Sequence, residues 1–129
     1  MPIRALDVAA TALSANAMAQ AVTANNIANV NTAGFNPSRV SFEERPDLGG
    51  VALQDIRETD VQGSFVPANA PIQGQDGAEA QSSGYVEGSG TDMVTETVQM
   101  IENERGFEAN AAVVRSVDEM LGQFLDEIV

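Results

Sequence analysis

Residues 25–35 read NNIANVNTAGF, with asparagine at four of the first seven positions. Asparagine is a poor helix former because its short amide competes for nearby backbone groups, yet this stretch directly follows a helical pattern. Gly34 can adopt the left-handed conformation that ends or turns a chain. Burial of Ile27, Val30 and Phe35 would stabilise such a turn by roughly 1.5–3 kcal/mol for each side chain that is fully covered. The stretch therefore predicts the end of a helix and a turn held by apolar side chains.

The asparagine amides of this stretch can serve two purposes. They can bond main-chain groups of the turn or of a neighbouring molecule, which would fix a packing register without using charge. They can also simply cap a frayed helix end. The amides in question belong to Asn25, Asn26, Asn29 and Asn31.

The segment before this turn, about residues 3–30, is predicted to be a helix. Its apolar residues alternate in spacings of three and four, the pattern of a heptad seam, with Gln20 as a polar break. The seam consists of Ile3, Leu6, Ala10, Leu13, Ala17, Ala24 and Ile27. Alanine favours a helix and lets another helix approach closely, but it buries little area, so this helix is expected to be marginal alone.

A second long helix is predicted over about residues 91–128, with Thr91 or Asp92 as its cap. One apolar seam comprises Met93, Met100, Phe107, Ala111, Val114, Leu121, Leu125 and Ile128. A further stripe comprises Val94, Val98, Ile101 and Ala112, and later Val113, Val117, Met120 and Phe124. Two stripes imply neighbours on more than one side of the helix.

The middle segment, about residues 36–90, has a different composition, with four of the five prolines and eight of the eleven glycines. Alternating patterns at 39–43 and 51–56 predict short strands, whereas 73–84, QGQDGAEAQSSG, has the composition of a linker. We expect the single tyrosine, Tyr85, to pack at the base of the helices.

The sequence thus predicts a mainly α fold. Long helices in the terminal segments 1–35 and 91–129 would form an antiparallel, coiled-coil-like pair around a loop-rich or β insert at 36–90. Such a pair leaves apolar surface uncovered, which favours self-assembly or a partner.

Composition disfavours several classes of partner. The chain has 19 acidic residues and six arginines, a net charge of -13, which repels nucleic acid and anionic membrane surfaces. It has no cysteine and no histidine, so we expect no disulfide, metal site or cofactor. No apolar run reaches the ~18 residues needed to span a bilayer. Polar residues such as Asp7 interrupt the N-terminus, so no cleaved signal peptide is expected.

Residues 26–35, NIANVNTAGF, closely resemble the N-terminal signature of bacterial flagellar rod and hook proteins. Residues 93–110 and then 118–121, DEML, resemble the C-terminal domain of the same family. Phe35 and Phe107 stand where the family usually has tyrosine. The resemblance implies a structural subunit of the basal-body rod that polymerises through its terminal helices. It also implies export, without a cleaved signal peptide, by the flagellar export apparatus, and assembly with other rod and hook-basal-body subunits. A chain this short looks more like a proximal rod protein.

On this basis we expect an assembly interface formed by both terminal segments. Its expected residues are Leu6, Leu13, Asn26, Ile27, Asn29, Asn31, Gly34, Phe35, Met100, Phe107, Val114, Leu121 and Leu125. An alternative is a small acidic type III secretion chaperone or another helical adaptor. An enzyme using Glu102, Glu104 and Glu108 is disfavoured, because no other polar catalytic residue type converges on these carboxylates.

Overall fold

The computed structural model describes residues 2–47, 49–67 and 84–128. Two long helices enclose four strands in the chain, and the strands form two separate two-stranded antiparallel sheets, β1–β2 and β3–β4. The elements are α1 (Pro2–Ala28), β1 (Ser38–Glu44), β2 (Val51–Glu58), β3 (Phe65–Pro67), β4 (Tyr85–Glu87) and α2 (Met93–Ile128). The prediction of a mainly helical chain with a small β insert is confirmed. The linker predicted at 73–84 lies, except for its last residue, outside the described residues.

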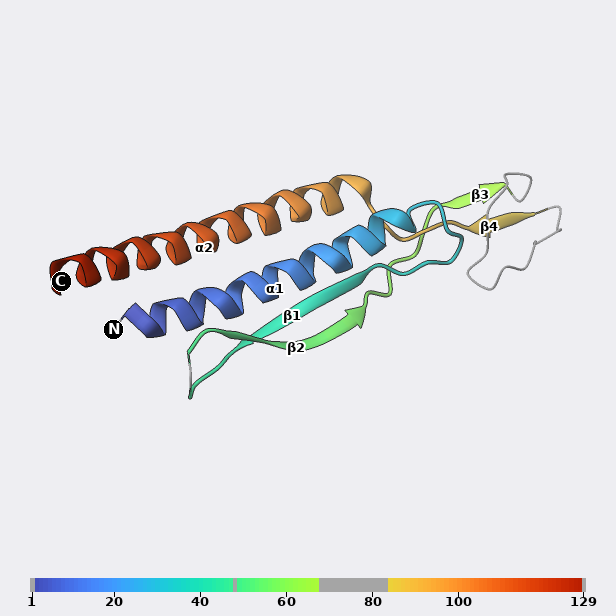
Figure 1. Ribbon diagram of the computed structural model, residues 1–129. Coiled ribbons are helices and arrows are strands. Elements are labelled where there is room, and N and C mark those ends of the chain that lie inside the picture. Colours follow the sequence, from blue (N-terminus) through green and yellow to red (C-terminus); the bar gives the residue numbers. More distant parts are fainter. Residues whose placement is uncertain (1, 48, 68–83, 129) are drawn as a thin grey trace.

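The two helices lie side by side and run in opposite directions, so that the N- and C-termini are at the same end of the molecule (Figure 1). The β1–β2 hairpin lies along α1 on the side away from α2, and β3–β4 extends beyond the end where α1 finishes and α2 begins (Figure 1). At 1.5 Å per residue, the 36 residues of α2 make a rod of about 54 Å. The molecule is therefore elongated, and α1 is its central element.

The end of α1 and the start of α2 have the local chemistry that the sequence predicts. After α1, the N–H of Asn29 is shared between the carbonyls of Asn25 and Asn26, each 3.2 Å away, and Gly34 has a positive φ of 66°. Asp92 caps α2: the Val94 N–H donates to its Oδ1 at 2.9 Å, and the Thr95 hydroxyl donates to its Oδ2 at 3.0 Å. Of the two candidate caps in the sequence, Thr91 and Asp92, the structure therefore uses Asp92.

The β1–β2 hairpin is attached to α1 near its turn. Val51 at the start of β2 donates its N–H to the Thr11 hydroxyl of α1 at 3.2 Å. Gly50, with φ of 86°, lies against Thr11 so closely that a Cβ atom would collide with the threonine side chain. Glycine is therefore required here both by the backbone conformation and by the space.

Few side chains are buried, as expected for so thin a molecule. Among the described residues only Ala9, Phe35 and Val117 are buried hydrophobics. Tyr85 is 75% exposed, so the prediction that it packs at the base of the helices is wrong. It lies in the short β4 strand, which has only β3 as its sheet partner and so offers no core for the ring. A single chain thus leaves much of its apolar surface in water.

Candidate functional site

The face of α2 that contacts α1 is mainly polar or small. The covered positions of α2 recur at spacings of three and four and include Glu96, Gln99, Met100, Asn103, Gly106, Asn110, Ala111, Val114 and Val117. Gly106 lies against the Asn16 side chain of α1. Of the predicted seam, Met100, Ala111 and Val114 are among these covered positions, whereas Met93 and Phe107 are 44% and 41% exposed. The helices therefore approach through amides and small residues together with the part of the predicted seam formed by Met100, Ala111 and Val114.

The first part of the second apolar stripe of α2 lies on the opposite side of the helix, whereas its later member Val117 is buried. Successive residues turn by about 100°, so Val94 and Val98 lie roughly 160–200° away from Glu96, which faces α1. Val94, Val98 and Ile101 are 72%, 50% and 52% exposed. We call these three residues the outer ridge. Within the described chain no element covers the outer ridge, so it is a contiguous apolar strip in water.

The signature turn after α1 is held together by bonds within the chain. Asn29 donates its Nδ2 to the Asn25 carbonyl at 2.9 Å and accepts the Thr32 hydroxyl at 3.1 Å. The Gly34 N–H donates to the Glu87 carbonyl of β4 at 3.0 Å. Phe35 is buried, and its carbonyl accepts the Gly90 N–H at 2.9 Å. The turn thereby connects α1 to the strand and loop that lead into α2.

Asn26 bridges three elements of the structure and is completely buried. Its amide pairs with the Ser38 backbone at the start of β1, donating from Nδ2 to the carbonyl and accepting the N–H on Oδ1, both at 2.8 Å. The same Nδ2 donates to Oε2 of Glu96 in α2 at 3.1 Å. Because both amide atoms are engaged, the orientation of the Asn26 side chain is fixed.

Glu96 is a carboxylate with no exposed surface, and a cation reaches it from the hairpin. Nη2 of Arg39 lies 2.6 Å from Glu96 Oε1. Oε1 accepts no hydrogen bond from the described residues, so its contact with Arg39 is an ion pair. The Arg39 side chain is one-third exposed, whereas that of Glu96 is fully buried. We call Asn26, Ser38, Arg39 and Glu96 the buried polar cluster.

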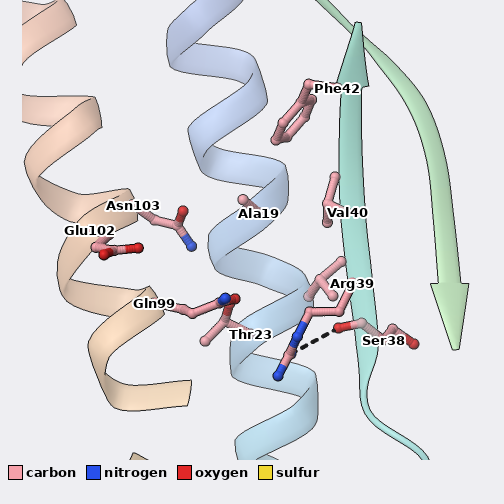
Figure 2. A pocket seen from close by; sticks show the side chains of 10 residues that line it. Ala19, Thr23, Ser38, Arg39, Val40, Phe42, Gln99, Glu102 and Asn103 are labelled. Carbon is pink, nitrogen blue, oxygen red and sulfur yellow. Dashed lines mark hydrogen bonds between the residues drawn. The ribbon is translucent and has the colours of Figure 1, made fainter. Parts of the chain in front are cut away.

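A shallow groove of about 170 Å³ begins beside this cluster and is lined by α1, β1 and α2. Figure 2 shows Gln99 and Asn103 of α2 on one side and Val40 and Phe42 of β1 on the other, with Ala19 of α1 between them. No titratable pair suited to acid–base chemistry converges in it. In residues 2–47, 49–67 and 84–128, no three acidic, histidine or cysteine side chains gather to hold a metal ion. Neither helix, over its described residues, is long and apolar enough to cross a membrane.

The residues expected at an assembly interface fall into three groups. Exposed in the single chain are Leu6, Asn31, Gly34, Phe107, Leu121 and Leu125. Half-buried are Leu13, Ile27, Asn29, Met100 and Val114. Asn26 and Phe35 are buried against their own chain, so we assign these two side chains to the interior and not to the outer surface.

Sequence reasoning missed Glu96 and Arg39. An acidic residue in the first turn of a helix is the ordinary complement to the helix dipole, so Glu96 gives no sign of burial. Arg39 is one of six scattered arginines, and only the packing of β1 along α1 brings it to Glu96. A buried polar cluster made by residues so far apart in sequence has no local signature.

A thin molecule with two long antiparallel terminal helices and an uncovered apolar ridge has the architecture of a subunit of a larger assembly. Residues 6–36 match the family model described as flagella basal body rod protein, and residues 82–127 match that of the flagellar basal body rod FlgEFG protein C-terminal region. The chain belongs to the flagellar basal-body rod protein family. The resemblance noted at both ends of the sequence is thereby confirmed.

One curated relative shows the extent of this similarity. The flagellar basal-body rod protein FlgG of Bacillus subtilis (strain 168) is 31% identical over 87 residues, which make up 67% of this chain and 32% of that protein. The chain therefore spans about a third of the length of this relative.

Proposed function

We propose that this chain is a structural, non-catalytic subunit of the flagellar basal-body rod that polymerises through its terminal helices to form part of the drive shaft. Membership of the family supports the rod assignment. The observation that carries polymerisation is the outer ridge, because Val94, Val98 and Ile101 are at least half exposed. Monomeric proteins rarely keep contiguous apolar surface in water unless a partner covers it.

The charge distribution favours a particular pairing of faces. The exposed face of α1 carries small, uncharged residues at Ala10, Ser14, Ala17, Ala21 and Ala24. Exposed carboxylates such as Glu104 and Glu108 accompany the outer ridge along α2. Two ridges facing each other would bring these carboxylates together, whereas the α1 face between Ala10 and Ala24 has no carboxylate and Asp7 lies one turn before it. The outer ridge of one copy accordingly packs on the α1 face of the next, in coiled-coil-like fashion. Contacts between unlike faces build open helical polymers, the symmetry a rod requires.

Partners and location follow from the same role. The chain assembles with itself and with other rod and hook-basal-body subunits in the periplasm-spanning rod. It reaches that place through the flagellar export apparatus without a cleaved signal peptide. The exposed residues expected earlier at the interface, among them Phe107, Leu121 and Leu125, add a second apolar surface on the side of α2 that faces α1.

The test uses a charge placed on the outer ridge. Val98→Asp should leave the monomer folded, because position 98 is exposed, but should prevent assembly by burying an unpaired carboxylate. Gln54→Asp, at an exposed position of β2, adds the same charge away from the helices and serves as the control. Assembly is followed by sedimentation velocity and electron microscopy over a range of concentrations, and function by motility of cells that depend on each variant.

Two outcomes would overturn the proposal. One is equal motility with Val98→Asp and Gln54→Asp. The other is a wild-type chain that stays monomeric while cells lacking it build complete flagella. A stoichiometric cytoplasmic complex with an export substrate would instead support the alternative role of a secretion chaperone.

A further inference from the structure

The contact between α1 and α2 contains few large apolar side chains that would fix how far one helix is displaced along the other. The α2 side offers Gln99, Asn103, Gly106 and Asn110 beside three covered apolar side chains, Met100, Val114 and Val117, and α1 presents mainly alanine and asparagine. Large apolar side chains that interdigitate would make sliding costly, but on α2 most of them lie at the edge of the contact or on the outer ridge. A shift of one turn moves a helix by about 5.4 Å and would bring Asn103 or Asn110 opposite Asn16 in place of Gly106.

The buried polar cluster does distinguish one register from the others. Glu96 has no exposed surface, and its oxygens are met by Asn26 Nδ2 at 3.1 Å and Arg39 Nη2 at 2.6 Å. Asn26 cannot follow a moving α2, because two 2.8 Å bonds hold its amide to the Ser38 backbone. Sliding α2 by one turn would separate the carboxylate from both partners. A buried carboxylate without partners is strongly disfavoured, whereas a single buried polar contact is a known means of setting helix register.

The cluster is also the link between α2 and the hairpin. Among the described residues, no Cα atom of α2 lies within 8 Å of one in β1 or β2. Arg39 of β1 nevertheless reaches Glu96, which Asn26 in the last turn of α1 also contacts. One carboxylate therefore relates the positions of α1, α2 and the hairpin to each other.

We propose that Glu96 is a positioning residue that sets the longitudinal register of α2 against α1 and the hairpin. Through that register Glu96 aligns the outer ridge with the exposed face of α1. The alignment matters for assembly only if the proposed function holds, whereas the register itself is a property of the single chain.

The absence of cysteine allows a direct test by disulfide trapping. A Cβ atom at Gly106 would lie 2.9 Å from Asn16 Oδ1, so the pair Asn16→Cys with Gly106→Cys reports the register seen here. Asn16→Cys with Asn110→Cys, or with Asn103→Cys, reports a shift of about one turn in either direction. Intramolecular disulfide formation is measured under mild oxidant at a concentration where the chain is monomeric.

With Glu96 present, we expect the first pair to form a disulfide at least about tenfold faster than either shifted pair. Glu96→Ala should reduce this ratio to about threefold or less. This variant has no carboxylate that would be buried without partners in the shifted registers. Glu96→Gln should keep most of the preference, because its amide oxygen still accepts the Asn26 bond. Val117→Ala is the matched control, since it removes buried contact from the same face of α2 without touching the cluster.

The proposal is overturned if Glu96→Ala and Val117→Ala give the same ratio of disulfides. Should Glu96→Ala not fold, as judged by circular dichroism, Arg39→Ala replaces it, and an unchanged ratio in that variant counts against the proposal. Because the measurement uses monomers, a wild-type chain that fails to polymerise would count against the proposed polymerisation and leave the register result unaffected.

Discussion

Gly106 of α2 faces Asn16 of α1 so closely that a Cβ atom at position 106 would lie 2.9 Å from the asparagine Oδ1. Asn16 is itself held, since its Nδ2 donates to the Ala12 carbonyl at 2.9 Å. A glycine within a helix costs about 1 kcal/mol relative to alanine. Here the missing side chain of Gly106 leaves room for Asn16 and lets the two helices approach closely.

Gly106→Ala should therefore fail to give the stability that alanine normally brings to a helix. Gly122→Ala is the control, because nothing lies within 4 Å of a Cβ atom there. We expect Gly122→Ala to raise the free energy of unfolding by up to about 1 kcal/mol and Gly106→Ala to leave it unchanged or lower it. Denaturant titration of the dilute monomer measures both. Equal gains would show that the helices do not meet at this position.

Phe35→Ala should lower the free energy of unfolding by about 3 kcal/mol, because Phe35 is one of the few buried apolar side chains. Tyr85→Ala should change it by less than about 0.5 kcal/mol, because that ring is exposed. As the chain has no tryptophan and one tyrosine, acrylamide quenching of tyrosine fluorescence reports the exposure of Tyr85 directly. Strong protection from acrylamide in the monomer would contradict the structure.

The stabilisation of α2 by its cap should depend on pH in the acid range. The hydroxyl of Thr95 and the N–H of Val94 bond the Asp92 carboxylate and hold its pKa below the ordinary value. The folded chain therefore binds this proton less readily than the unfolded chain. The stabilisation is complete above the ordinary aspartate pKa, ~3.9, and is lost as the pH falls through the lowered folded value.

Asp92→Asn keeps a residue that can cap α2 but removes the negative charge of the cap. Asparagine caps a helix but does not titrate, so this variant should lose the part of the acid-range dependence that Asp92 supplies. Thermal unfolding of both proteins from pH 5 to pH 2 makes the comparison. Parallel curves over the whole range would show that the cap carboxylate contributes nothing to the pH dependence.

Asn29→Ala should lower the free energy of unfolding by about 1 kcal/mol, because its amide bonds Asn25 and Thr32 within the turn. Asn31→Ala, at an exposed position of the same turn, should leave it within about 0.5 kcal/mol. Denaturant titration distinguishes the two variants. A larger loss with Asn31→Ala would mean that the signature turn is stabilised differently from the bonds described above.

The sequence by itself determined the two long helices and the β1–β2 hairpin, but not the short strands β3 and β4. Heptad spacing predicted both long helices, alternation predicted the paired strands β1 and β2, Asp92 was available as a cap, and Gly34 was expected to take the left-handed conformation that it has. These features depend on residues close to each other in the chain, so local chemistry is sufficient to specify them.

Only the tertiary structure decided which face of each helix meets the other. The apolar periodicity of α2 is compatible with more than one contact face, and the face that meets α1 carries Gln99 and Asn103, because small and amide residues allow the closer approach. Glu96 is buried only because Asn26, seventy residues earlier, and Arg39 of β1 surround it. Burial of a charge depends on where distant partners come to lie, and no pattern within one helix specifies that.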